Sequence, residues 1–287
     1  MDNENRGNMM KRKLEAVLCD LDGSLLNSDK LISDEDLGTI HRLKENGVHV
    51  HIVSGRAAAF CRQNADEIGF DSLVSCCNGG YIYDFSKEEI VCHGQLLDSR
   101  DVLGIRNYCI SHGISYLIYS LEGVFFDRPD SRRTLFWKQQ SEEHFSEANK
   151  IVFRYDSEDL DFSSLHFVKI LLCYVTKEDA ENVRHLFNKE NRYEIVFSEK
   201  NLLDINAVGT NKGHAVEELA KTVGFDLRNT IVLGDNFNDE MMLKKAGYPI
   251  VPENGEEDMK KLAFYITSDN NDSPLSKAIR ECFPDYL

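Results

Sequence analysis

The stretch Ala16-Val-Leu-Cys-Asp20-Leu-Asp22-Gly-Ser24-Leu-Leu26 is an apolar run that stops at two aspartates set two residues apart, followed at once by glycine. A continuous Val/Leu run bounded by a turn signal is typical of a central parallel strand, and open α/β sheets bind ligands beyond the carboxyl ends of such strands. Residues i and i+2 of an extended chain point the same way, so Asp20 and Asp22 can reach one reacting centre while Gly23 lets the chain turn. Asp-Gly is also common turn chemistry, so this stretch alone leaves a plain strand and turn open.

The length and composition of the chain describe an ordinary globular protein. Its 287 residues are enough for two domains with a sizeable core, and 42% hydrophobic with 29% charged residues is a usual balance. There are 33 basic and 49 acidic residues, a formal net charge of -16. This charge repels nucleic acid and anionic membranes at long range, so we expect neither as a partner and favour a small diffusible ligand.

Three features of the sequence indicate a cytoplasmic location. The eight cysteines lie in apolar stretches without CxxC spacing, which argues against a zinc site or a disulfide framework and for reduced core residues. Residues 1–13 are polar and lack the apolar segment of a signal peptide, so we expect a flexible N-terminal lead. An uncharged apolar run of 18 residues occurs nowhere, and we therefore expect no membrane span.

Strands and helices alternate after the first apolar run. Ser33-Asp-Glu-Asp36 is typical of a helix N-terminus, and Gly47 closes that helix. A second strand over 48–53 ends at Ser54-Gly55-Arg56, which opens another helix and could cradle an anion through a hydroxyl and backbone N–H groups. Such a tripeptide alone is more often a simple loop. The further strands expected in this part lie over 71–76, 81–84 and 90–93.

Residues 90–190 have a different pattern of expected helices, strands and loops, which predicts an inserted α/β domain with its own core. The elements expected in and next to this segment are a helix over 99–112, strands over 114–119, 124–127 and 168–174, a helix over 176–188 and a strand over 193–197. A polar, loop-rich region is expected over 128–164. Its cluster of Arg128, Arg132, Arg133 and Trp137 could grip a ligand phosphate, although basic residues in such a loop are more often simply solvated.

Beyond residue 200 the pattern of the N-terminal part returns, with strands that lead into helices. After residues 202–206, Lys212 lies in the first turn of a helix, where it opposes the helix dipole, so it is either solvated or compensated by an anion. The apolar run 230–233 also ends in carboxylates, in Gly234-Asp235-Asn-Phe-Asn238-Asp239. Acidic residues therefore follow the carboxyl end of this expected strand, as they follow that of the first.

This alternation of strands and helices predicts a fold class and a division into domains. We expect an α/β protein with a doubly wound, Rossmann-like parallel sheet as its core. The core is expected over residues 14–89 and 191–287, and the inserted domain over 90–190.

Four motifs at strand ends follow one another along the chain. They are Asp20-x-Asp22-Gly-Ser24, Ser54-Gly55-Arg56, Lys212 and Gly234-Asp235-x-x-Asn238-Asp239. Together they resemble the motifs of the haloacid dehalogenase (HAD) superfamily of aspartate-nucleophile phosphohydrolases, and within it the Cof-type branch with a C2-type α/β cap inserted between the second and third motifs. The resemblance covers the chain beyond residue 13, with Ser24 in place of the usual threonine.

The resemblance implies a role for each of these residues. Asp20 is implied to be the nucleophile that forms an aspartyl-phosphate, and Asp22 the general acid and base. The groups implied to hold the phosphoryl oxygens are Ser54, the Gly55 amide, Lys212 and Asn238. The implied metal ligands are Asp20, Asp235 and the backbone carbonyl of Asp22, with Ser24, Arg56 and Asp239 in supporting positions.

Charge also favours a cation at this site. A phosphate dianion next to ionised Asp20 meets a repulsion of about 4 kcal/mol per unit charge at about 4 Å, or about 8 kcal/mol in total, for an effective dielectric near ~20. Because the whole chain is acidic, the counter-charge must be local, and Asp20 with Asp235 forms a hard-oxygen site for Mg²⁺. Lys212 supplies a second positive group.

The sequence thus predicts a Mg²⁺-dependent phosphatase that hydrolyses small phosphorylated metabolites, sugar phosphates first. Two alternatives stay open: phosphoryl transfer to another sugar, as in related mutases, and a non-catalytic sensor of phosphorylated metabolites. The intact Asp20, Asp22, Lys212 and Asp235 argue against the sensor, because a pure binder gains nothing from a nucleophile. The sequence leaves the oligomeric state open.

Overall fold

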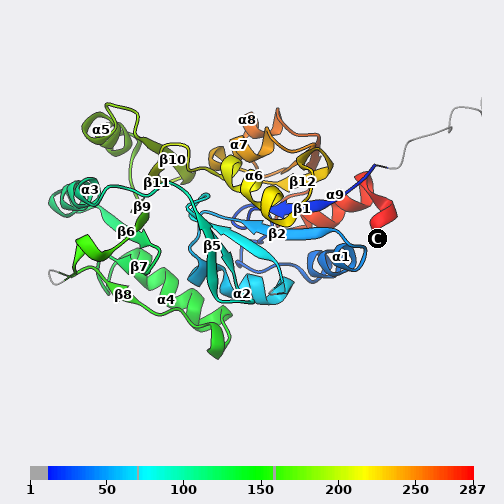
Figure 1. Ribbon diagram of the computed structural model, residues 1–287, viewed down its shortest axis with the longest axis horizontal. Helices are drawn as coiled ribbons and strands as arrows, with labels where there is room; N and C mark the ends of the chain where they lie inside the picture. The colour runs from blue at the N-terminus through cyan, green and yellow to red at the C-terminus, as the bar shows by residue number, and fades with distance from the viewer. Residues whose placement is uncertain (1–11, 70, 158–159) are drawn as a thin grey trace, which may run out of the picture.

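The structure is a computed structural model that describes residues 12–69, 71–157 and 160–287 (Figure 1). Most of the expected N-terminal lead, residues 1–11, lies outside this part. Two β-sheets organise the chain, one of eight strands and one of six. None of the described helices is long and apolar enough to cross a membrane.

The eight-stranded sheet carries the motifs at its strand ends. Its strands are β1 (Ala16–Cys19), β2 (His49–Val53), β3 (Leu73–Cys76), β4 (Tyr81–Asp84), β5 (Glu89–His93), β12 (Thr230–Leu233), β13 (Tyr248–Pro252) and β14 (Tyr265–Thr267). Their spatial order is β14-β13-β12-β1-β2-β3-β4-β5. Pairing is parallel from β14 to β3 and antiparallel for the β4–β5 hairpin. The predicted doubly wound α/β core is therefore confirmed.

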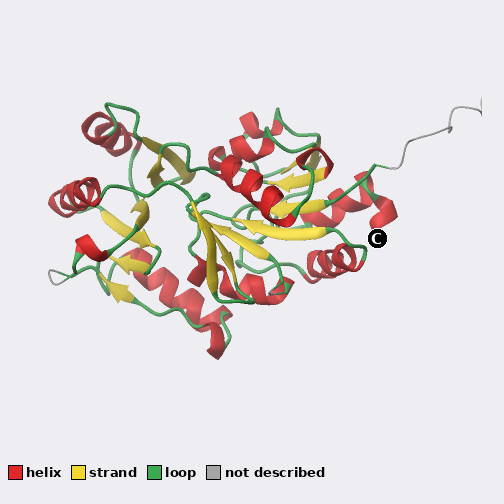
Figure 2. Cartoon of the chain, in the orientation of Figure 1, coloured by secondary structure: helices red, strands yellow, loops and turns green. Residues whose placement is uncertain are grey.

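Helices cover both faces of this sheet (Figure 2). Those on one face are α1 (Asp34–Glu45), α2 (Ala58–Ile68) and α9 (Pro274–Cys282), and those on the other are α6 (Lys212–Val223), α7 (Glu240–Leu243) and α8 (Glu257–Lys260). Alternate residues of β1 pack into the two layers: Val17 and Cys19 contact the first set and Leu18 the second. Burial on both faces explains why this strand is apolar throughout.

The six-stranded sheet forms a second layer beside the core, at the left of Figure 1. Its strands, in spatial order, are β10 (Tyr193–Glu199), β11 (Leu202–Ala207), β9 (Phe167–Cys173), β6 (Ser115–Ser120), β7 (Gly123–Phe126) and β8 (Arg154–Tyr155). Helices α3 (Ser99–His112) and α5 (Lys177–Phe187) cover one face. Residues of the other face, such as Tyr119 and Leu171, belong to the same apolar cluster as Phe60 of α2. This face of the sheet is therefore packed toward the core.

Short 3-10 helices complete the described part of the chain. They are η1 (Glu147–Asn149), η2 (Phe162–Ser164), η3 (Leu227–Asn229), η4 (Phe237–Asp239) and η5 (Pro284–Tyr286).

The strands that form the second sheet do not match the domain boundaries expected at residues 90 and 190. β5 pairs with β4 in the large sheet, whereas β10 and β11 pair with each other and with β9 in the small one. All six residues of β11 are buried, so its sequence resembles that of a central parallel strand although it is antiparallel. We therefore propose that the cap domain runs from about residue 95 to about residue 208.

The expectation of a loop-rich region over 128–164 is wrong for its first half, which forms helix α4 (Arg132–His144). Ser131 caps this helix by accepting a hydrogen bond from the Thr134 backbone N–H. The buried residues of α4 are Thr134, Trp137 and Ser141. Because two of these are polar, the helix lacks the apolar stripe by which helices are recognised.

Candidate active site

Three neighbouring strands bring the predicted motifs together. Asp20 follows β1, Ser54 follows β2, and Asp235 lies two residues beyond β12. Because the order β12-β1-β2 is parallel, the carboxyl ends of these strands meet at one edge of the sheet. Helix α6 begins at Lys212, whose side chain reaches the same edge.

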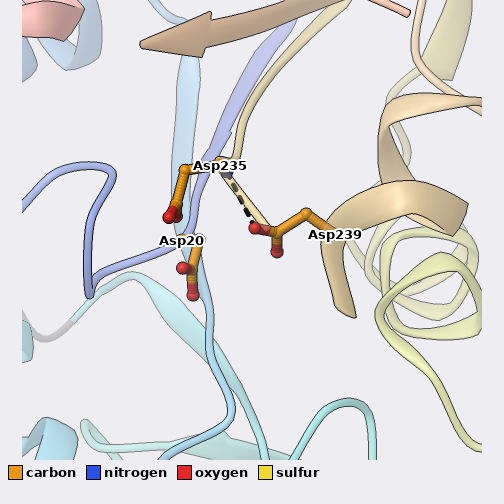
Figure 3. Close-up of side chains that lie close together, drawn as sticks. All are labelled: Asp20, Asp235 and Asp239. Atoms are coloured by element: carbon orange, nitrogen blue, oxygen red, sulfur yellow. Dashed lines mark hydrogen bonds between the residues drawn. The ribbon is translucent and has the colours of Figure 1, made fainter. Parts of the chain in front are cut away.

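Asp20, Asp235 and Asp239 form a tight cluster of carboxylates at this edge (Figure 3). One oxygen from each lies within 4.8 Å of those from the other two. Lys212 is completely buried, and its Nζ lies 2.6 Å from an oxygen of Asp20 and 2.6 Å from an oxygen of Asp239. The anions that compensate this lysine in the first turn of α6 are thus two carboxylates.

Burial and mutual repulsion shift the protonation of this cluster. Burial raises the pKa of Asp20 to about 7, although Lys212 opposes the effect. Burial, with Asp239 and Asp20, also raises the pKa of Asp235 well above its usual range. Burial lowers the pKa of Lys212, but its two carboxylate partners outweigh this and raise the pKa overall. If every group is ionised, three carboxylates and one ammonium leave two negative charges uncompensated.

The donor set of this cluster fits a divalent cation. Asp239 is fully engaged, since one oxygen contacts Lys212 and the other accepts the backbone N–H groups of Asp235 and Asn236 at 2.9 and 3.0 Å. Asp235 accepts one hydrogen bond of 2.8 Å, from the Ser24 hydroxyl. Asp20 and Asp235 are therefore the carboxylates that can offer oxygens to a hard cation. The two positive charges of a divalent cation would offset the two uncompensated negative charges of the cluster.

Asp22 directs its carboxylate to two other cations. Arg56 donates Nε and Nη2 to the two oxygens of Asp22 at 2.6 and 2.7 Å, and Lys30 Nζ lies 2.7 Å from one of them. Burial opposes ionisation here, but Arg56 and Lys30 prevail and lower the pKa of Asp22 below its usual range. Asp22 could join a metal site only through its backbone carbonyl, because its side chain is held by these cations.

Polar contacts tie the loop after β2 to the cap. Lys169 of β9 donates to the backbone carbonyl of Gly55 and forms a buried ion pair of 2.9 Å with Asp204 of β11. Asp204 accepts a hydrogen bond of 2.7 Å from Asn78, which in turn accepts one of 3.1 Å from Asn238. Two of the predicted phosphate-binding residues are thus tied to cap strands, Gly55 directly and Asn238 through Asn78.

One pocket collects most of the predicted site residues. It is lined by Asp20, Asp22, Ser54, Gly55, Arg56 and Asn238 from the core and by Tyr119, Arg133, Trp137, Lys169, Glu199 and Asp204 from the cap, among others. Its volume is about 40 Å³. A larger cavity of about 480 Å³, lined by α2, the β4–β5 hairpin and the cap, shares Phe60 with this pocket but contains none of the predicted site residues.

Comparisons with known proteins agree with the fold. The model of the haloacid dehalogenase-like hydrolase family matches residues 17–279. The chain belongs to this family. A solved haloacid dehalogenase-like hydrolase from Bacteroides thetaiotaomicron is 24% identical, with a TM-score of 0.78 and coverage of 94% of this chain and 100% of that one, which shows that the fold is shared.

Two curated relatives of this HAD hydrolase are named phosphatases. A 5-amino-6-(5-phospho-D-ribitylamino)uracil phosphatase from Bacillus subtilis is 28% identical over 267 residues, which are 93% of this chain and 95% of the relative. A pyridoxal phosphate phosphatase from Escherichia coli is 23% identical over 92% of this chain and 96% of its own length. These names support a phosphomonoesterase activity for the HAD hydrolase described here.

Some residues that line the pocket beside Asp20 were not predicted from the sequence. Lys169 and Asp204 each interrupt an apolar run, and two opposite charges in two buried strands are a signal that could have paired them. The arginine cluster divides: Arg128 pairs with Asp130 on the surface and Arg132 stacks on Tyr174, whereas Arg133 lines the pocket with Trp137. Arg133, which is partly exposed, is thus the arginine of this cluster that is placed to contact a ligand.

Proposed function

We propose that this chain is a Mg²⁺-dependent phosphatase for small phosphorylated metabolites, sugar phosphates first among them, which works through an aspartyl-phosphate on Asp20. The observation that carries the proposal is the placement of Asp20 at the end of β1, 2.6 Å from buried Lys212 and beside Asp235. The name of the Bacillus relative describes a phosphate on a ribityl chain, which is consistent with polyol-like substrates.

The charged groups around Asp20 would let a phosphate dianion approach it. Lys212 is one positive group at this carboxylate, and Mg²⁺ held by Asp20, Asp235 and the Asp22 carbonyl would supply the second, screening the phosphoryl oxygens from Asp20. An oxygen of Asp20 attacks phosphorus as the bond to the leaving alkoxide breaks. Ser54, the Gly55 amide, Lys212 and Asn238 hold the equatorial oxygens as charge spreads over them.

Asp22 would transfer the protons in both half-reactions. It gives a proton to the leaving alkoxide first and takes one from the attacking water afterwards. The ion pair with Arg56 favours the carboxylate form of Asp22, which is the form needed for the second half-reaction. The first half-reaction requires this pair to separate, so we propose that substrate entry displaces Arg56 from Asp22.

The pocket is small in this structure. A volume of about 40 Å³ accommodates about three water molecules, which is less than a phosphorylated metabolite needs. The cap contributes Tyr119, Arg133 and Trp137 to the lining of the pocket. We propose that the cap opens to admit substrate and closes to exclude water from the reacting phosphorus.

Phosphate release from a panel of phosphorylated metabolites tests this function. We expect turnover with Mg²⁺ and none after chelation by EDTA. Appearance of the phosphoryl group on a sugar hydroxyl instead of in solution would show phosphoryl transfer. Absence of turnover on every substrate, with binding retained, would show a sensor.

Replacing Mg²⁺ by Ca²⁺ should leave binding intact but support little turnover. Ca²⁺ takes about six to eight oxygens at longer distances and accepts bidentate carboxylates, so it can occupy both oxygens of Asp20 and leave neither for phosphorus. We expect kcat with saturating Ca²⁺ to fall to roughly a hundredth of the Mg²⁺ value or below, a loss of about 3 kcal/mol in transition-state stabilisation. Equal rates with the two ions would contradict the double role of Asp20 as ligand and nucleophile.

Gly23→Ala should weaken metal binding by displacing Asp235. A Cβ at this position, where φ is +80°, would lie 2.5 Å from an oxygen of Asp235. We expect the Mg²⁺ concentration for half-maximal activity to rise about tenfold, the effect of about 1.4 kcal/mol. Gly47→Ala is the matched control, because φ there is +76° but nothing lies within 4 Å of the added Cβ. Equal Mg²⁺ dependence of the two variants would count against Asp235 as a ligand.

A further inference from the structure

Two residues of one cap helix that line the pocket each carry a buried N–H donor. Arg133 and Trp137 are four residues apart on α4 and therefore share a face of it. The Nε of Arg133 and the Nε1 of Trp137 are both buried and have no hydrogen-bond partner among the described residues. Buried donors of this kind are rarely left unpaired. We therefore expect a group from outside the chain to accept hydrogen bonds from them.

The side chain of Trp137 is held firmly in place beside the pocket. Only 3% of the residue is exposed, and its ring stacks on Phe60 of α2 with centroids 4.2 Å apart and planes 11° apart. The guanidinium of Arg56 lies 5.2 Å from the centroid of the Trp137 ring. The indole therefore links the cap to the residue that pairs with Asp22.

Arg133 differs from the other cations that line this pocket. Arg56 is paired with Asp22 and Lys169 with Asp204. The guanidinium of Arg133 contacts rings instead, 4.9 Å from the centroid of Phe136 and 5.5 Å from that of Trp137, and no carboxylate of the described residues forms an ion pair with it. Glu199 also lines the pocket but is exposed to solvent.

We propose that Arg133 and Trp137 bind a second oxyanion of the substrate, a carboxylate or a further phosphate carried by the leaving group. This inference rests on the proposed phosphatase function and names the substrate class of the same site. An oxyanion offers acceptors to both N–H donors and neutralises the guanidinium, and hydrogen bonds between charged groups are the stronger ones. A neutral hydroxyl would leave the partly exposed guanidinium of Arg133 without a counter-ion.

Matched pairs of substrates test the proposal in the intact Mg²⁺-loaded enzyme. Phosphoglycerate and glycerol phosphate differ by a carboxylate in place of a hydroxymethyl group, and a hexose bisphosphate differs from the hexose monophosphate by one phosphate. We expect kcat/KM to be about 10- to 100-fold higher for the anionic member of at least one pair, as for a charge-assisted hydrogen bond. The pair that shows the preference identifies the oxyanion as carboxylate or phosphate.

Substitutions on α4 assign this preference to Arg133. Arg133→Gln should reduce the anionic preference about tenfold or more, and Arg133→Lys should retain part of it because the charge remains. Arg132→Gln is the matched control, since this neighbour is exposed, stacks on Tyr174 and does not line the pocket. Equal losses on both members of a pair in Arg133→Gln, or no preference in the wild-type enzyme, would overturn the proposal.

A small aryl phosphate without a second charge separates this proposal from the proposed function. Hydrolysis of the aryl phosphate by the wild-type enzyme, without any anionic preference, would overturn only the role of Arg133 and Trp137. Failure to hydrolyse the aryl phosphate and all four metabolites would overturn the phosphatase function itself.

Discussion

Asp20→Asn is expected to lower kcat by more than a hundredfold while the fold remains intact. An amide is close to isosteric with the carboxylate, but it is a poor nucleophile and a weaker ligand for a hard cation. A hundredfold loss corresponds to about 3 kcal/mol of transition-state stabilisation, and loss of the covalent intermediate should exceed it. Steady-state phosphate release at saturating Mg²⁺ measures the effect.

The surroundings of Asp20 explain why this variant should still fold. Lys212 contacts Asp20 and Asp239 at the same distance of 2.6 Å, so the buried ammonium keeps one carboxylate partner after the substitution. The neutral amide would also remove a negative charge from a cluster that carries an excess of them. A thermal melt within a few degrees of the wild-type value, together with retention of more than about a hundredth of kcat, would refute Asp20 as the nucleophile.

The core of the fold could be predicted because the strands that carry motifs are largely apolar: β1 throughout, β12 after Thr230, and β2 apart from its two histidines. β1, β2 and β12 each end in polar groups, and parallel pairing brings those ends to one edge without further information. The ion pair of Lys212 with Asp20 realises one of the two expectations for a lysine in the first turn of a helix, compensation by an anion instead of solvation.

The cap was harder to predict because its decisive contacts join distant parts of the chain. β11 is buried along its whole length, which in sequence resembles a parallel core strand, and only its antiparallel pairing with β9 and β10 assigns it to the cap. Arg133 and Trp137 come from a helix whose buried positions include Thr134 and Ser141. In sequence Arg133 and Trp137 belong to a basic cluster that could bind a phosphate, but neither hydrophobic periodicity nor a motif favours this over simple solvation.

The second large effect is expected from Lys212→Met, which should reduce both stability and turnover. Methionine fills similar space but leaves Asp20, Asp235 and Asp239 close together without a positive partner. Breaking a buried ion pair by removing one member costs about 3–5 kcal/mol, and we expect a loss of that order in the free energy of unfolding at neutral pH in EDTA. Lys245→Met is the control, because Lys245 pairs with Glu217 at a partly exposed position, where a pair contributes about 0–1 kcal/mol.

Acidification should restore part of the stability of Lys212→Met. In the wild-type protein burial already raises the pKa values of Asp20 and Asp235, and loss of the ammonium raises them further. Between the unfolded and the folded pKa values the native state then binds more protons than the unfolded state, so stability increases as pH falls through the folded pKa toward the unfolded one. Urea denaturation at a series of pH values measures this change. A stability loss that is independent of pH would indicate a packing defect instead of uncompensated carboxylates.

Asp239→Asn in the Lys212→Met background separates stability from catalysis. The amide oxygen introduced by this second substitution could still accept from the backbone N–H groups of Asp235 and Asn236, which Asp239 now holds at 2.9 and 3.0 Å. Removal of one buried negative charge should therefore recover about 1 kcal/mol or more of the loss, roughly the value of relieving one uncompensated polar group. Turnover should stay low, because the phosphoryl group still lacks the ammonium beside Asp20. Recovery of turnover together with stability would show that Lys212 only supports the fold and takes no part in binding the phosphoryl group.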